Sequence, residues 1–132
     1  MRDLSTPQSS STPDRILICG NSGADKSTLA KSLAEIYALA HLDLDTLAWE
    51  QANAPTRRAL DRSRTEIDKF TAVNDGWVIE GAYADLLGLL LDECSELIFL
   101  NPGVEADEYL LGSHRWLFDR FNGVKREYTA LA

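Results

Sequence analysis

The chain has 132 residues, of which 45% are hydrophobic and 26% are charged, and its formal net charge is −8. This length suits one domain with a single hydrophobic core, and no apolar run approaches the roughly 20 residues of a membrane-spanning helix. Nucleic acids and anionic lipids attract proteins through positive charge, so the acidic balance argues against both kinds of partner.

The first residues and the two cysteines indicate the cellular compartment of the protein. Residues 1–14 are rich in Ser, Thr and Pro and lack the apolar stretch of a secretory signal, so we expect a disordered leader before one domain over residues 15–132. Cys19 and Cys94 lie in or beside apolar runs, which is typical of buried thiols rather than of a disulfide or metal cluster. We therefore expect a reducing, cytoplasmic location.

The amino-terminal half of the domain predicts two strands and two helices. Apolar, β-branched residues 15–19 predict a buried strand, and leucines at helical spacing predict a helix over residues 27–40. Residues 41–45 (HLDLD) predict a short strand that ends in carboxylates. A second amphipathic helix is expected over residues 55–73, because proline is favoured in the first turn of a helix.

The carboxy-terminal half predicts two more strands and two more helices. Strands are expected over residues 77–80 and 96–100, the latter halted by Asn101-Pro102-Gly103, with a leucine-rich buried helix over residues 83–94 between them. A last helix is expected over residues 109–121, with His114 on its apolar stripe as a core histidine.

Strands that alternate with helices predict a three-layer α/β fold, in which a parallel sheet carries helices on both faces. Ligands of such sheets bind beyond the carboxyl ends of the strands. The glycine-rich turn after the first strand, the aspartates of the second strand, and Glu80 and Gly81 of the third strand all fall at this edge.

Residues 20–28 (GNSGADKST) differ at one position from the phosphate-binding pattern G-x-x-x-x-G-K-[ST]. Backbone N–H groups before the helix would converge on the phosphates of a nucleotide, where the helix dipole also favours an anion. Lys26 would reach the β- and γ-phosphate oxygens, and Ser27 would ligate Mg²⁺. The predicted nucleotide-binding residues are Gly20, Asn21, Ser22, Gly23, Ala24, Asp25, Lys26, Ser27 and Thr28.

Asp25 is the departure from this pattern, because it puts a Cβ and a carboxylate where the pattern has glycine. The alternative for the whole segment is a glycine-rich turn between a strand and a helix, in which Ser27 and Thr28 only cap the helix.

These motifs resemble those of small-molecule kinases of the P-loop class, the group that contains shikimate kinase, adenylate kinase and the bacterial topology-modulation proteins. The resemblance covers residues 16 to about 104 and rests on GNSGADKST, HLDLD and WVIEGAY. It implies a P-loop NTPase fold with ATP and Mg²⁺ as ligands. By this resemblance Asp43 lies near Mg²⁺, Asp45 lies against the substrate hydroxyl, and the acid-glycine pair Glu80 and Gly81 lies near the water shell of the metal.

The carboxylates and arginines also have plainer interpretations. Asp43 and Asp45 are alternatively solvated caps at a strand end, and Glu80 is alternatively an ordinary turn acid. Arg57 and Arg58 would clamp a carboxylate or phosphate of the substrate, but alternating charges on a helix are also typical of a solvated face. The predicted site residues are Lys26 and Asp45 for catalysis, Asp45, Arg57, Arg58 and Gly81 for the substrate, and Ser27, Asp43 and Glu80 for the metal.

Kinases of this kind carry an arginine-bearing lid between the fourth strand and the last helix. Here few residues separate Val104 from Tyr109, so the sequence predicts a fold shortened after the fourth strand and without a lid. We expect an ATP-dependent phosphotransferase for a small hydroxyl-bearing metabolite, with impaired activity. The alternative hypothesis is a non-catalytic, kinase-like remnant that acts through a protein partner or through self-association as a homodimer. Arg115 and Arg120 are candidates to replace the arginines of the lid.

Overall fold

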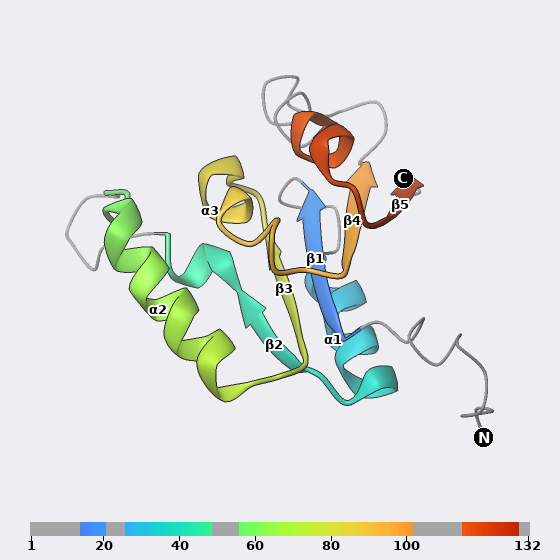
Figure 1. The fold of residues 1–132 in the computed structure, drawn as a ribbon, viewed down its shortest axis with the longest axis horizontal. Helices are drawn as coiled ribbons and strands as arrows, with labels where there is room; N and C mark the ends of the chain where they lie inside the picture. Colours follow the sequence, from blue (N-terminus) through green and yellow to red (C-terminus); the bar gives the residue numbers. More distant parts are fainter. Residues whose placement is uncertain (1–13, 21–25, 49–55, 102–114, 130–132) are drawn as a thin grey trace.

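The computed structural model describes residues 14–20, 26–48, 56–101 and 115–129 (Figure 1). The described strands form one five-stranded sheet in the order β2-β3-β1-β4-β5, and every neighbouring pair is parallel. The strands are β1 (Arg15–Gly20), β2 (Ala40–Asp43), β3 (Trp77–Gly81), β4 (Glu96–Asn101) and β5 (Val124–Thr129). The predicted α/β class with a parallel sheet is therefore confirmed.

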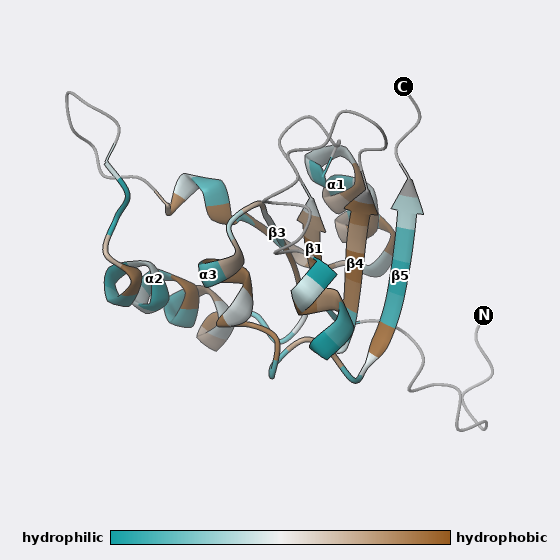
Figure 2. Ribbon diagram, turned by 90° about the horizontal axis from the view of Figure 1, so that it is seen from above, coloured by the Kyte–Doolittle hydropathy of each residue, from teal (hydrophilic) through white to brown (hydrophobic). Residues whose placement is uncertain are grey.

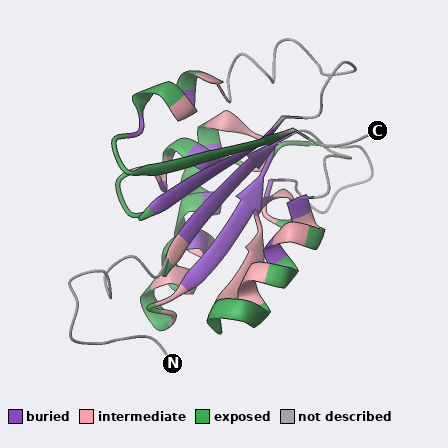
Figure 3. Cartoon of the chain, turned by 90° about the vertical axis from the view of Figure 1, so that its right-hand side faces the viewer, coloured by how far each residue is buried: buried purple, intermediate pink, exposed green. Residues whose placement is uncertain are grey.

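Helices cover both faces of the sheet, as the alternation of buried side chains along its strands requires (Figure 3). On β1, Ile16 and Ile18 face α1 (Lys26–Tyr37), where they pack with Ala30. The intervening Leu17 and Cys19 belong to the larger core on the other face. That core also receives side chains from α2 (Leu60–Val73), from α3 (Ala84–Gly88) and from the helical residues 115–120.

The central strands are apolar because both of their faces are covered, whereas β5 is polar and lies at one edge of the described sheet (Figure 2). Central β3 and β1 are buried along nearly their whole length. In β5, Val124 and Tyr128 are about half exposed. The sequence analysis missed β5, because the charged run Lys125-Arg126-Glu127 looks like a solvated surface rather than a strand.

Several predicted helix bounds were wrong, and tertiary contacts explain why. Helix α1 ends at Tyr37 rather than at residue 40, because Ala38 adopts a left-handed φ of 57° and the chain then enters β2. Helix α2 begins at Leu60 rather than at residue 55, because the preceding backbone is bonded elsewhere: the Arg58 N–H donates to the Ala48 carbonyl over 2.7 Å. Arg57 and Arg58 therefore precede the helix instead of lying on it.

The predicted helix over residues 83–94 is wrong for most of its length. Helix α3 ends at Gly88, and the following residues form turns with i→i−3 bonds, such as Leu90 N–H to the Leu87 carbonyl and Glu93 N–H to the Leu90 carbonyl. The leucines of this segment are buried against the sheet, and turns bury them as well as a helix would, so their spacing did not identify the backbone conformation. The predicted strand over residues 41–45 ends at Asp43, and Leu44–Thr46 form a 3₁₀ turn that carries Asp45.

Two further expectations concern the leader and the segment that follows β4. Asp14, assigned to the leader, is tied to the sheet, since its carbonyl accepts from the Trp77 N–H over 2.7 Å. Residues 102–114, which hold the predicted shortening, the missing lid and His114, lie outside the described residues. Within the described ranges, no helix has the length and apolar character to cross a lipid bilayer.

Candidate functional site

The parallel order of the sheet brings the candidate residues to one edge. Gly20, Asp43 and Gly81 end β1, β2 and β3, which are neighbours in the sheet. Glu80 of β3 lies in register with Ile18 of β1 on one side and with Asp43 of β2 on the other. Residues 21–25 of the glycine-rich turn lie outside the described residues, so the described site consists of the groups on either side of them.

Lys26 opens α1 and folds back over the end of β1. Its side chain is only 6% exposed, and its Cδ atom lies 3.5 Å from the position that a Cβ on Gly20 would occupy. A Cβ on Gly20 would also meet the Leu100 carbonyl oxygen at 3.0 Å, so this position has no room for a larger residue. A glycine before the turn therefore lets the lysine lie across the carboxyl end of the sheet.

Ser27 and Glu80 are joined directly. The Ser27 hydroxyl donates to Glu80 Oε1 over 2.9 Å, although 53 residues separate them in the chain. Glu80 is 1% exposed, and its second oxygen, Oε2, lies 2.5 Å from His41 Nε2. The alternative of an ordinary turn acid does not fit Glu80, since Glu80 lies within β3 and its carboxylate is buried and held by two side chains from different elements.

Asp43 and Asp45 lie beside this group in the turn after β2. The Asp43 Oδ1 atom accepts from the Asp45 backbone N–H over 2.9 Å, so Asp43 caps the 3₁₀ turn as the plainer interpretation proposed. Asp45 Oδ1 is buried and has no hydrogen-bond partner among the described residues. Nothing in the described part of the chain therefore satisfies this oxygen.

Several charged neighbours affect the pKa of the Asp45 carboxyl. Burial raises the pKa of the Asp45 carboxyl above its ordinary value, and the nearby Asp43 carboxylate raises it further. Lys26, a hydrogen bond from the Ala82 backbone and Arg57 act in the opposite direction. A carboxyl whose pKa is raised by burial and by a like charge, and which faces cations, is typical of a functional site.

Gly81 contributes to this arrangement through packing. It is buried, and a Cβ there would meet Leu44 Cβ at 3.0 Å and Leu44 Cδ1 at 3.1 Å. Leu44 precedes Asp45 in the 3₁₀ turn and is fully buried. The glycine thus allows the turn to lie against the end of β3, which positions Asp45. Contact of Gly81 with a substrate stays a prediction.

The two arginines have different surroundings from those predicted on a helix. The Arg57 Nη2 atom donates to Asp85 Oδ1 and Oδ2 over 3.1 and 2.9 Å, and its guanidinium lies 4.4 Å from the centre of the Tyr83 ring. Arg57 is therefore anchored to the start of α3 while its charge still acts on Asp45. Arg58 is anchored through its backbone to Ala48.

The arginines of the last helix are also engaged. Arg115 donates from both terminal nitrogens to the Glu127 carboxylate over 2.8 and 2.7 Å, and its guanidinium lies 4.9 Å from the centre of the Phe99 ring. The Arg120 guanidinium lies 4.6 Å from the centre of the Trp116 ring. These contacts give both arginines a role in holding the last helix, and a role in place of a lid stays a prediction.

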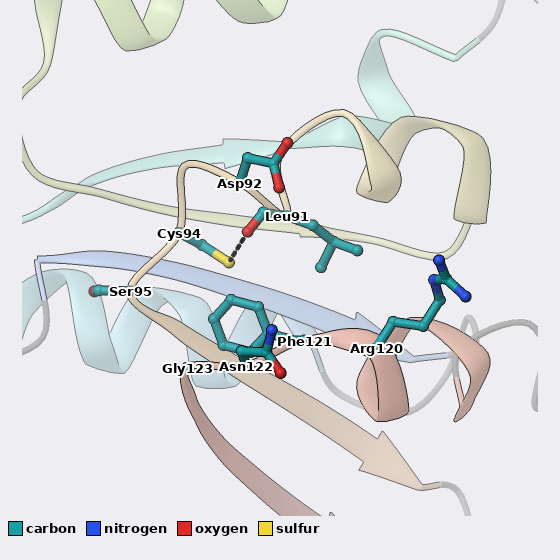
Figure 4. A pocket seen from close by; sticks show the side chains of 8 residues that line it. All are labelled: Leu91, Asp92, Cys94, Ser95, Arg120, Phe121, Asn122 and Gly123. Carbon is teal, nitrogen blue, oxygen red and sulfur yellow. Dashed lines mark hydrogen bonds between the residues drawn. The ribbon is translucent and has the colours of Figure 1, made fainter.

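A separate pocket of about 520 Å³ lies at the amino end of β4, the opposite edge of the sheet (Figure 4). The Cys94 thiol lines it and donates to the Leu91 carbonyl over 3.6 Å. Burial raises the pKa of the Cys94 thiol, and likewise that of Cys19, to about 12, so both are protonated and unreactive at neutral pH. The prediction of two buried free thiols is confirmed.

The donor set fits Mg²⁺ bound together with a phosphate ligand. Among the described residues, no group of three or more His, Cys, Asp or Glu side chains is arranged to hold a metal. Mg²⁺ does not require such a cage, because it keeps several waters and usually binds through one or two protein oxygens and the phosphates of the substrate. Ser27, Asp43 and Glu80 supply oxygens of this kind at the edge where Lys26 lies.

Sequence reasoning missed His41 as a member of the site. Its position two residues before Asp43 on a strand places it on the same face as Asp43, and this alternation was the available signal.

Comparisons with known proteins give a likeness in architecture. No protein-family profile matches the chain, and no curated protein is significantly similar to it. Among solved structures, the crystal structure of shikimate kinase from Bacteroides thetaiotaomicron is similar over 89% of this chain and 86% of that chain, at 16% sequence identity and a TM-score of 0.49.

Proposed function

We propose that this chain binds ATP with Mg²⁺ at the carboxyl edge of its sheet and transfers the γ-phosphoryl group slowly to a small, hydroxyl-bearing metabolite. The observation that carries the proposal is the bond from Ser27 to the buried Glu80, beside Lys26 at the end of β1. Capping of a helix by Ser27 would not require a buried acid on another strand. An acid held against this serine, next to a lysine, is the arrangement that a magnesium nucleotide requires.

Each residue has a definite part in this proposal. Lys26 neutralises the β- and γ-phosphate oxygens, and residues 20–28 surround the phosphates. Ser27 and Asp43 would hold the metal, and Glu80 would lie near its water shell. When bound, Mg²⁺ would reduce the negative charge that repels the attacking hydroxyl.

The acceptor would bind at Asp45. Its buried Oδ1 atom, which has no hydrogen-bond partner among the described residues, is suited to accept a hydrogen bond from a substrate hydroxyl. The hydroxyl oxygen then attacks the γ-phosphorus of ATP, the bond from that phosphorus to the bridging oxygen breaks to release ADP, and the hydroxyl proton passes to Asp45. A raised pKa makes Asp45 a stronger base than an exposed aspartate. Arg57 and Arg58 supply positive charge for an acidic substrate.

Binding is tested by thermal denaturation with ATP and Mg²⁺. A ligand at about 100 times its dissociation constant adds roughly 2.7 kcal/mol to the free energy of unfolding. We expect Lys26→Met to lose this stabilisation, because it keeps the aliphatic stem over Gly20 but removes the charge. Lys31→Met is the matched control, since Lys31 is an exposed lysine on the same helix.

Transfer is tested separately by ADP release in the presence of hydroxyl-bearing metabolites. We expect rates well below the roughly 1–100 s⁻¹ of typical kinases, because Asp25 stands in the phosphate turn. If millimolar ATP with Mg²⁺ produces no stabilisation of the unmodified protein, the proposal is wrong and the non-catalytic remnant becomes the favoured hypothesis.

A further inference from the structure

We propose that His41 is a positioning residue, which orients the Glu80 carboxylate toward Ser27 and so sets the Mg²⁺ dependence of nucleotide binding. This inference rests on the proposed function of the site. It gives a role to His41, a side chain to which neither the phosphate-binding pattern nor the acidic motifs assign one.

The two oxygens of Glu80 have different partners, which come from different elements. Oε1 accepts from the Ser27 hydroxyl at the start of α1, and Oε2 is bonded to His41 Nε2 on β2. With 1% of Glu80 exposed, water does not compete for these oxygens. A carboxylate held at both oxygens by different elements has one orientation, so loss of either partner frees it to rotate.

The sheet explains why His41 can reach this carboxylate. His41 is in register with Val78, and Asp43 is in register with Glu80, two pairs further along the same ladder. Residues that are paired in register on two adjacent strands face the same side of the sheet, as do residues two positions apart on one strand. Val78 packs in the core beneath α1. His41 therefore contacts Glu80 on the α1 face of the sheet. It precedes Asp43 on β2, so it lies farther than Asp43 from the carboxyl end of the strand.

This placement separates His41 from direct contact with the metal. Ser27 can donate its proton to Glu80 and present its oxygen lone pairs to Mg²⁺ at the same time, provided that Oε1 stays where the structure has it. His41 holds Oε2 and so keeps Oε1 in place. Partners of this kind typically change metal affinity by about 10–100-fold when they are removed.

The alternative is that His41 only satisfies a buried acid. That role predicts a loss of stability on substitution, but no specific change in metal dependence. The experiment therefore measures ATP binding by calorimetry, first in EDTA and then over a Mg²⁺ titration, for the unmodified protein, His41→Leu and His41→Gln. Leu removes the hydrogen bond, whereas Gln keeps an N–H donor at a similar reach.

We expect His41→Leu to require about tenfold more Mg²⁺ for half-maximal enhancement of ATP binding, with its affinity in EDTA unchanged. His41→Gln should need an Mg²⁺ concentration close to that of the unmodified protein. If His41→Leu does not fold, His41→Gln together with His41→Asn, which has a shorter reach, provides the same comparison.

Equal Mg²⁺ dependence in the unmodified protein and His41→Leu would overturn this inference and leave the proposed function intact. Failure of His41→Gln to recover what Leu loses would also overturn it, because the hydrogen bond would then not be the operative feature. Absence of any Mg²⁺-dependent binding by the unmodified protein would overturn the proposed function, and the inference with it.

Discussion

The Ser27 hydroxyl donates to Glu80 Oε1 over 2.9 Å and thereby joins the first turn of α1 to the carboxyl end of β3. A helix and a strand that are distant in sequence are connected at the point where nucleotide phosphates are expected. The bond has a structural consequence as well as the proposed functional one, since it supplies a donor to a buried carboxylate.

Replacement of Ser27 by alanine should therefore lower both stability and metal-dependent binding. Loss of one partner of a buried charged acceptor costs about 1–3 kcal/mol, which thermal or urea denaturation would detect. ATP binding should also lose its Mg²⁺ enhancement. Ser32→Ala is the control, because Ser32 is exposed on the same helix, and it should change neither quantity. A Ser27→Ala protein that keeps full Mg²⁺ enhancement would remove Ser27 from the proposed metal site.

Replacement of Asp45 should raise stability rather than lower it, and the size of this effect should depend on pH. Its pKa is raised in the folded protein, chiefly by burial, so the folded state holds this proton more tightly than the unfolded state does. The stabilisation from this group is present below its ordinary pKa of 3.8 and is lost as pH rises through the raised folded value. At neutral pH the charged Asp45 therefore destabilises the fold.

Asp45→Asn should accordingly increase the free energy of unfolding at pH 7, by on the order of 1 kcal/mol. The gain should shrink as the pH is lowered toward 4, where the native carboxyl is increasingly protonated. Urea denaturation across this pH range in EDTA measures the effect without bound metal. A gain that did not depend on pH would mean that the charge is not its cause.

The contrast between Gly81 and Gly88, the glycines that end β3 and α3, tests how the fold positions Asp45. In Gly81→Ala, the new Cβ would stand 3.0 Å from Leu44 Cβ, so the buried Leu44 and the turn that carries Asp45 must shift. Overpacking of this kind costs about 1–3 kcal/mol. We expect lower thermal stability and weaker binding of the acceptor substrate.

Gly88→Ala is the matched control. A Cβ on Gly88 would find its nearest neighbour, Leu117 Cδ2, at 4.0 Å, and the residue is exposed at the end of α3. Alanine there should be neutral or slightly stabilising, because it has the higher helix propensity. Equal stability of the two variants would show that Leu44 and its turn can move aside without cost.

Local patterns were sufficient to predict the part of the fold that depends on burial at both faces of the sheet. The first, third and fourth strands are continuous apolar runs, and their predicted positions agree with β1, β3 and β4 to within one residue. Periodicity was less informative for helices, because the leucines of residues 86–91 are buried whether the backbone is helical or turns more tightly. Edge strand β5 has no continuous apolar run, because charged residues occupy its middle.

The candidate site was predictable only in outline. Motif spacing and strand ends were enough to bring Lys26, Asp43 and Glu80 to one edge of the sheet. The Ser27–Glu80–His41 chain of contacts was predictable only in part, because strand alternation gives the face of His41 but the contacts also depend on the order of the strands. The anchoring of Arg57 by Asp85 was hidden for the same reason, since Asp85 comes from a distant element.

Asp25 lies outside the described residues, and its expected effect follows from charge. It stands where the phosphate-binding pattern has glycine, so its carboxylate adds negative charge next to the expected phosphates. At an effective dielectric constant of about 20, two like unit charges about 6 Å apart repel by roughly 3 kcal/mol. Exposure to solvent and the charge of Lys26 should reduce this to about 1–2 kcal/mol.

Asp25→Gly should therefore strengthen ATP binding by about tenfold, as measured by calorimetry in the presence of Mg²⁺. Glycine would also relieve the backbone if this position requires a positive φ, so a second variant is needed to separate the two causes. Asp25→Asn removes the charge and keeps the Cβ. Recovery of affinity with both variants would identify repulsion as the defect, whereas recovery with glycine alone would identify backbone strain. If neither variant binds ATP better than the unmodified protein, and Lys26→Met also changes nothing, the segment is not a nucleotide site and GNSGADKST serves only to join β1 to α1.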